Sequence, residues 1–164
     1  MKNWQNKNFD GVSFNVVDLM KNALDRTLEQ DGDILQRGRS ERLFSNRLAC
    51  NLQVLLDKVL GEKNILRADS PYNKHSDDTK RISGHPIEVD LAIHQRGIDD
   101  HNVLVAEIET NNSPVGDDIW KIEEMTKKNG EYGYQAGFYL VLGIEGRAGE
   151  VLSQKWYING SEVK

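Results

Sequence analysis

The sequence has 164 residues but only one cysteine and three prolines. The single cysteine, Cys50, excludes an intramolecular disulfide framework and a zinc cluster built from cysteines. The few prolines, without any glycine repeat, exclude collagen-like and proline-rich polymers. No run of about 18 apolar residues is present, and the polar N-terminus has no apolar signal-peptide core. We therefore expect a cytoplasmic protein with no membrane partner.

The chain length predicts a single domain over residues 1–164, long enough to bury a sizeable core. The net charge of -5 argues against binding nucleic acid through bulk charge. The charge is unevenly distributed, however. Residues 85–124 hold ten acidic and two basic side chains, a net of -8, whereas residues 35–47 carry +3 and residues 63–81 carry +2. An acidic centre with basic segments before it suits a metal site that receives a phosphodiester.

Periodic apolar residues predict three helices. The first covers 13–31, with Ser13 as its cap and Gly32 at its end, and the clearest covers 40–60, with Ser40 as its cap. The third helix covers 116–129. Alternating or continuous apolar runs predict strands at 64–73, 86–95, 103–110, 134–144 and 150–158. This order predicts an α/β protein whose mixed sheet is flanked by helices.

Three acidic residues lie inside the predicted strands. Asp90 interrupts an apolar strand, and Glu107 and Glu109 lie two apart in the next one, so both point to the same face. Each could be a solvated acid at a strand end or on an exposed strip. Carboxylates that face one another across adjacent strands repel unless protons or cations intervene. Oxygen ligands of this kind favour magnesium, manganese or calcium over zinc.

A fourth acid, Glu41, lies at the start of the 40–60 helix, on the same stripe as Phe44 and Leu48. One interpretation is a first-turn glutamate that the helix dipole stabilises. The other is a carboxylate that projects into a site next to the core.

The ordered segments resemble the PD-(D/E)XK nuclease superfamily. The residues that carry this resemblance are the helix around Glu41 (SERLFSNRLACNL), the aspartate strand (PIEVDLAIHQRG), the next strand (NVLVAEIETNN) and the helix and strand that follow. The resemblance covers about residues 38–145 and implies a restriction-endonuclease-like fold, with a mixed sheet of four or five strands. It also implies that Asp90, Glu107 and the carbonyl of Ile108 bind Mg²⁺ or Mn²⁺, and that Glu41 joins the site.

The sequence departs from the family pattern where Glu109 replaces the motif lysine. That lysine stabilises developing phosphate charge, which a glutamate cannot do, although a glutamate can act as a general base or a metal ligand. Some members move the lysine to a neighbouring helix, and Lys121 is the candidate here. An alternative is that Lys121 is a solvated helix lysine that pairs with nearby acids such as Glu124.

The resemblance implies a metal-dependent DNA endonuclease that hydrolyses phosphodiester bonds. The departure at Glu109 leaves open a catalytically silent module of the same fold that binds nucleic acid or a protein partner. A third hypothesis is a protein that binds calcium or a phosphate ligand without nuclease chemistry. Many nucleases of this fold act as dimers, so a homodimer is one expectation. His94 shares the face of Asp90, and we expect a hydrogen-bonded strand-end histidine there rather than a ligand of the site.

Overall fold

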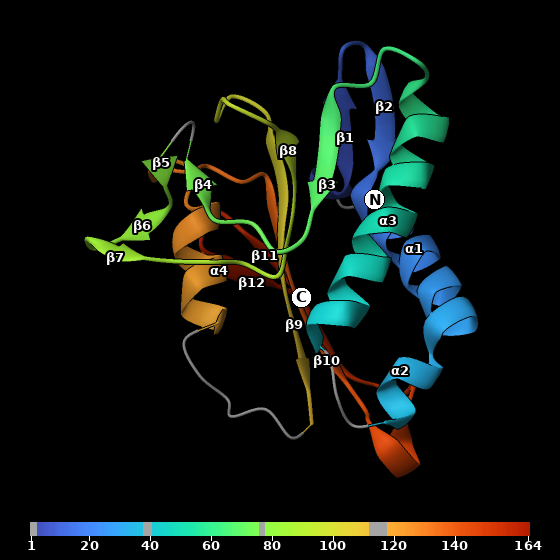
Figure 1. Cartoon of the computed structure of the whole chain (residues 1–164). Coiled ribbons are helices and arrows are strands. Elements are labelled where there is room, and N and C mark those ends of the chain that lie inside the picture. Colours follow the sequence, from blue (N-terminus) through green and yellow to red (C-terminus); the bar gives the residue numbers. More distant parts are fainter. Residues whose placement is uncertain (1–2, 38–40, 76–77, 112–117) are drawn as a thin grey trace.

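A central mixed sheet organises the protein in the computed structural model, which describes residues 3–37, 41–75, 78–111 and 118–164. Figure 1 shows that helices cover both sides of this sheet, with α4 on the side opposite to α1, α2 and α3. The helices are α1 (Val16–Asp31), α2 (Asp33–Gln36), α3 (Glu41–Leu60) and α4 (Asp118–Thr126). The strands of the sheet, in spatial order, are β12 (Ser161–Val163), β11 (Val151–Ile158), β10 (Ala136–Leu142), β9 (Asn102–Thr110), β8 (Leu91–Gln95) and β3 (Leu66–Asp69). Only the pair β9–β10 is parallel.

Smaller elements surround this core. A hairpin of β1 and β2 precedes α1, and two short hairpins connect β3 to β8 on the side of α4 (Figure 1). Single turns of 3-10 helix lie at η1 and η2. Their bounds are η1 (Asn3–Gln5), β1 (Asn6–Phe9), β2 (Val12–Asn15), β4 (Lys74–His75), β5 (Asp78–Thr79), β6 (Arg81–Ile82), β7 (His85–Pro86) and η2 (Glu145–Arg147).

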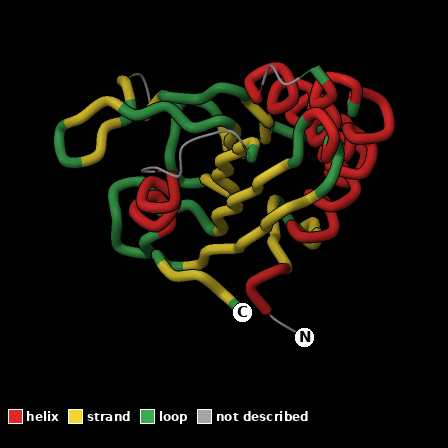
Figure 2. Tube along the Cα trace, turned by 90° about the horizontal axis from the view of Figure 1, so that it is seen from below, coloured by secondary structure: helices red, strands yellow, loops and turns green. Residues whose placement is uncertain are grey.

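The two faces of the sheet bury different side chains because neighbouring strand residues point to opposite faces. One face packs on α1 and α3 through the apolar residues Leu91, Ile93, Leu104, Ala106 and Ile108. The other face lies under α4 and holds Ala92 and Val105 beside Met125. Seen along the sheet in Figure 2, the strands lie between the cluster α1–α3 and the single helix α4. The α/β class with a mixed sheet between helices is therefore confirmed.

The predicted number of four or five strands is wrong, because the sheet has six strands. The additional strand is β12, which pairs with β11 after a tight turn at Asn159 and Gly160. Both turn residues have positive φ angles, of 52° and 76°. The three residues of β12, Ser161–Val163, are too few to form an apolar pattern of their own. The strand exists because β11 provides its hydrogen-bonding partner.

The N-terminal helix also differs from the prediction. It begins at Val16, because the Asn15 side chain accepts hydrogen bonds from the N–H groups of Val17 (2.9 Å) and Asp18 (3.1 Å). Ser13, the expected cap, lies in β2. The hairpin before the helix turns at Asp10 and Gly11, which adopt the positive φ angles that such a turn requires.

The long helix α3 closely matches its predicted range of 40–60. Ser40, its expected cap, lies outside the described residues. The helix ends at Gly61, whose φ of 80° is a left-handed conformation that favours glycine. Phe44, Leu48 and Leu52 are fully buried against the sheet.

Candidate active site

The predicted site residues come together where β8 begins and β9 ends. These strands are antiparallel, with Leu91 opposite Ala106, so the residue before β8 lies beside the last half of β9. Asp90 occupies that position. Glu107 and Glu109 lie on the face of β9 that α4 covers, and both are buried.

Asp90 holds the edge of β9 through its side chain. Its Oδ2 accepts a hydrogen bond of 2.7 Å from the backbone N–H of Ile108. The carboxylate thus takes the position that a strand carbonyl would occupy. The strand β8 begins at Leu91 and not at residue 86 as predicted, because Ile87 and Val89 form backbone hydrogen bonds with Lys80 and Tyr72 instead. The N–H and C=O groups of one residue in an extended strand point to the same side. The carbonyl of Ile108 therefore points toward the side of Asp90.

The buried carboxyl of Glu107 shares a hydrogen bond with the partly buried carboxyl of Asp90. Burial raises the pKa of Glu107 well above its ordinary value, and the charge of Asp90 raises it further. Burial also raises the pKa of Asp90, although the N–H of Ile108 opposes that shift. The pair therefore needs a cation or a proton nearby.

Lys121 supplies a positive charge beside this pair. Its Nζ lies 2.7 Å from Glu107 Oε1 and 2.6 Å from Asp118 Oδ1, and it donates a 3.3 Å hydrogen bond to the carbonyl of Glu88. Burial alone would lower the pKa of Lys121, but the two carboxylates outweigh this effect and raise it. Lys121 is therefore not the solvated lysine of the alternative interpretation, because its side chain is only 17% exposed.

Glu109 belongs to a second acidic pair, next to the first. It shares a hydrogen bond with Asp118, and Tyr139 donates its hydroxyl to Glu109 Oε2 at 3.1 Å. Burial and the hydrogen bond with Asp118 raise the pKa of Glu109 to about 7. Asp118 itself has a lowered pKa, because the hydrogen bonds from Glu109 and Lys121 outweigh its burial. Of these two carboxyl groups in contact, Glu109 therefore favours the protonated form and Asp118 the ionised form.

Glu41 approaches the site from the first turn of α3. Its charge contributes to the raised pKa of Glu109. The neighbouring residue Arg42 pairs with Glu88 at 3.2 Å, which joins the start of α3 to the segment that leads into Asp90. The structure therefore brings together Asp90, Glu107, Glu109 and Lys121, with Glu41 near enough for its charge to act on Glu109.

Two residues of this cluster were not predicted as site residues, Asp118 and Tyr139. Asp118 is the acidic residue in the first turn of α4. Its spacing from Lys121, three residues along one helix, is the sequence signal that could have joined it to the site. Tyr139 carries no such signal, since only the parallel register of β10 against β9 places it opposite Glu107.

His94 lies outside the cluster, as expected. His94 lies four positions after Asp90 along the extended chain, a distance of about 13 Å. Its Nε2 lies 2.8 Å from Asp69 Oδ2, and Arg96 also pairs with Asp69 through two nitrogens. The expectation of a hydrogen-bonded strand-end histidine is confirmed.

The donor set fits a hard divalent cation. Asp90, Glu107 and the Ile108 carbonyl would provide only oxygen ligands, which Mg²⁺ and Mn²⁺ prefer. Glu107 Oε1 is buried and ion-paired, yet has no hydrogen bond of good geometry. Within the described part of the chain, no group of three or more His, Cys, Asp or Glu side chains is arranged to hold a metal. A metal here would therefore depend on two carboxylates and a backbone carbonyl.

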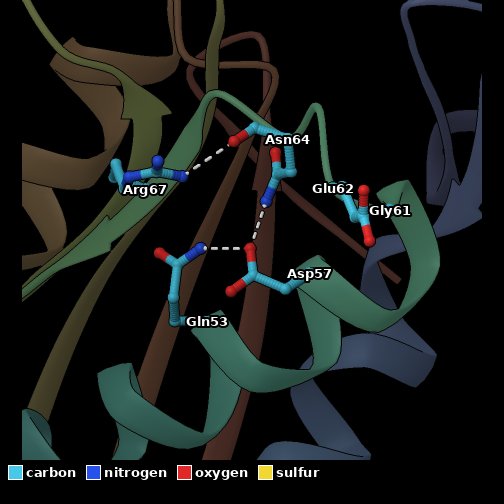
Figure 3. A pocket seen from close by; sticks show the side chains of 6 residues that line it. All are labelled: Gln53, Asp57, Gly61, Glu62, Asn64 and Arg67. Atoms are coloured by element: carbon cyan, nitrogen blue, oxygen red, sulfur yellow. Dashed lines mark hydrogen bonds between the residues drawn. The ribbon is translucent and has the colours of Figure 1, made fainter.

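A separate open pocket of about 580 Å³ lies at the C-terminal end of α3. Figure 3 shows Asp57 in this pocket accepting hydrogen bonds from Gln53 (2.9 Å) and Asn64 (2.8 Å). Arg67 donates to the carbonyl of Asn64 at 3.0 Å. These polar groups satisfy one another, and none of the predicted site residues lines the pocket.

Comparisons with known proteins do not identify the chain. No protein-family model matches it, and no curated protein matches it. The resemblance to PD-(D/E)XK nucleases therefore depends on the residues and their order alone. None of the helices in the described ranges combines the length and apolar character needed to cross a membrane.

Proposed function

We propose that this protein is a metal-dependent nuclease that hydrolyses phosphodiester bonds in DNA, with a restriction-endonuclease-like fold. One observation carries the proposal. Asp90, Glu107 and the Ile108 backbone converge at the start of β8, and a lysine from the helix after β9 lies directly beside them. The position of Lys121 supports the idea that it replaces the lysine missing from the strand motif, where Glu109 stands.

The residues divide the chemistry between them. Asp90 and Glu107 would hold Mg²⁺ or Mn²⁺ with the carbonyl of Ile108. When bound, such an ion would supply Lewis-acid activation of the phosphate and the attacking water. Glu109 would orient that water and accept its proton, with Oε2 held in place by the Tyr139 hydroxyl.

Lys121 would contribute the positive charge that a phosphodiester needs. Its ammonium stands between Glu107 and Asp118, so it can turn toward a phosphate oxygen without leaving the site. Glu41 would bind a second cation or position water from the side of α3. The exposed Arg42 lies at the rim, near Glu88, where a DNA backbone could reach it.

One observation favours a second candidate function. Lys121 already neutralises Glu107, as a structural ion pair would do in a site that has lost its metal. The alternative is a catalytically silent domain of this fold that binds nucleic acid or a protein partner.

The deciding experiment is cleavage of supercoiled plasmid and of labelled single- and double-stranded oligonucleotides, with Mg²⁺, Mn²⁺ or EDTA. Asp90→Asn is the matched variant, because an amide oxygen can still accept the N–H of Ile108 while the carboxylate charge is lost. We expect cleavage by the wild type with either metal, at least 100-fold slower cleavage by Asp90→Asn, and none in EDTA. Equal activity of wild type and Asp90→Asn, or no cleavage with any substrate, would refute the enzymatic proposal.

A further inference from the structure

A fully buried lysine lies outside the candidate active site. Lys80, between β5 and β6, has no exposed surface, and its Nζ has no hydrogen-bond partner. Three tyrosine rings surround the ammonium, with Nζ 4.5 Å from the centre of Tyr132, 5.1 Å from Tyr72 and 5.2 Å from Tyr134. We refer to Tyr72, Tyr132 and Tyr134 as the tyrosine cage.

The cage compensates for a position that is otherwise unfavourable. A buried ammonium without a hydrogen bond loses its hydration and gains nothing from an apolar neighbour. The faces of tyrosine rings carry partial negative charge and attract a cation within about 6 Å. Burial lowers the pKa of Lys80 to about 8, while the charges of Asp99 and Glu131 oppose that shift.

The cage also connects two parts of the molecule. Tyr72 forms an isolated antiparallel bridge with Val89, with two backbone hydrogen bonds of 2.9 Å, and Val89 immediately precedes Asp90. On the other side, the N–H of Tyr134 donates to the carbonyl of Met125 in α4, also at 2.9 Å. Lys80 lies between these two attachments.

The backbone of Lys80 strengthens the connection. Its N–H donates to the carbonyl of Asn73 at 2.6 Å, and its carbonyl accepts from Ile87 at 2.9 Å. The Tyr132 hydroxyl accepts a hydrogen bond from the N–H of the next residue, Arg81, and donates one to the carbonyl of Arg81. Together with the hydrogen bond from Lys121 to the carbonyl of Glu88, Lys80 and its cage therefore attach the segment before Asp90 to the region around α4.

We propose that Lys80 and the tyrosine cage act as a positioning element that holds the segment 87–90 against α4 and so sets the spacing between Asp90 and Lys121. Asp90 and Lys121 lie outside the six strands, so their spacing also depends on contacts beyond those that each makes with β9. The consequence for metal binding rests on the proposed function. The anchoring itself does not.

The test is hydrogen exchange by NMR on the full chain, together with titration of Mn²⁺. Lys80→Met keeps the length of the side chain and removes its charge. We expect the amides of Ile87, Val89 and Tyr134 to exchange at least tenfold faster, with amides of β10 unchanged. We also expect Mn²⁺ to bind at least tenfold more weakly than to the wild type.

Two further variants keep the test decisive if Lys80→Met folds poorly. Tyr72→Leu removes one wall of the cage and should reproduce the local increase in exchange. Tyr134→Phe keeps the ring and should behave as the wild type. Lys155→Met, at an exposed ion pair on β11, is the control for loss of a lysine.

The outcomes separate the two proposals. Unchanged exchange at Ile87, Val89 and Tyr134 in both Lys80→Met and Tyr72→Leu would overturn the positioning role. An equal increase throughout β10 would overturn it too, because it would indicate general destabilisation. Failure of the wild type to bind Mn²⁺ would instead count against the proposed function, and the exchange data would still decide the role of the cage.

Discussion

Replacing Lys121 with methionine tests the interpretation of the site most directly. The change removes the ammonium from Glu107 and Asp118 but keeps an unbranched apolar side chain in α4. Removing one partner of a fully buried ion pair costs about 3–5 kcal/mol. Lys121 retains 17% side-chain exposure, and Glu107 can take up a proton. We therefore expect a loss of about 1–3 kcal/mol of unfolding free energy, or roughly 2–4 °C in Tm per kcal/mol for a chain of this size.

The same change should have an opposite effect on metal binding. Lys121 competes with a divalent cation for Glu107, so Lys121→Met should bind Mn²⁺ at least as tightly as the wild type. Saturation would then restore stability, by about 2.7 kcal/mol at a free metal concentration about 100 times Kd. Cleavage should nevertheless fall by about 100-fold, because the charge that stabilises the phosphate is gone.

The assays are thermal unfolding with and without Mn²⁺, calorimetric titration of Mn²⁺, and plasmid cleavage. Lys127→Met is the matched control, since Lys127 lies in the turn after α4 and forms an exposed pair with Glu124. It should change stability by less than about 0.5 kcal/mol. The reasoning would be refuted if Lys121→Met lost stability and left cleavage unchanged, while neither this variant nor the wild type bound Mn²⁺. The ion pair would then be structural.

Three further predictions concern the fold that supports the site. Gly137→Ala should strongly destabilise the protein and weaken Mn²⁺ binding, because the new Cβ would lie 2.3 Å from Ile122 Cγ2 and push α4 away from the sheet. Thermal unfolding and titration of Mn²⁺ would measure these two effects. Asn15→Ala should cost about 1 kcal/mol in urea unfolding by removing the cap of α1, and an unchanged midpoint would contradict the capping role. Burial alone would raise the pKa of Asp69, but hydrogen bonds and charges from Arg96 and His94 hold it below its usual range. The Asp69 carboxylate therefore stabilises the fold above about pH 4, and this contribution to stability is lost as the pH falls further. Acid titration should therefore show a shallower loss of stability in Asp69→Asn than in the wild type, and parallel curves would rule out that contribution.

Sequence patterns predicted the helices and central strands well, because each pattern is local. The apolar stripe of α3 identifies its range closely, and the two apolar faces of β9 identify a central strand. The short elements at the ends of the chain escaped prediction. The hairpin β1–β2 buries only alternate residues among polar ones, and β12 has three residues. Such strands exist through their partners rather than their composition.

The site was predicted in part, for the same reason. The strand period places Glu107 and Glu109 on one face, and the antiparallel order of β8 and β9 brings Asp90 beside them. The pairing of Lys121 with Glu107 could not be deduced, since it depends on the angle at which α4 crosses the sheet. The tyrosine cage was equally hidden, because it joins residues from 72 to 134 that share no sequence pattern.

The sequence alone therefore determined the α/β class, the face of the sheet that carries the acidic residues, and the residues whose chemistry suits a divalent metal. These conclusions follow from local periodicity and from the high cost of burying carboxylates. Tertiary structure decided which charges meet. It pairs Lys121 with Glu107 and places Lys80 among three tyrosines. It also brings Glu109 and Asp118 together, which raises the pKa of Glu109 and lowers that of Asp118. The physical reason is that Coulomb and hydrogen-bond energies fall steeply with distance, and distances between remote residues are set only by packing.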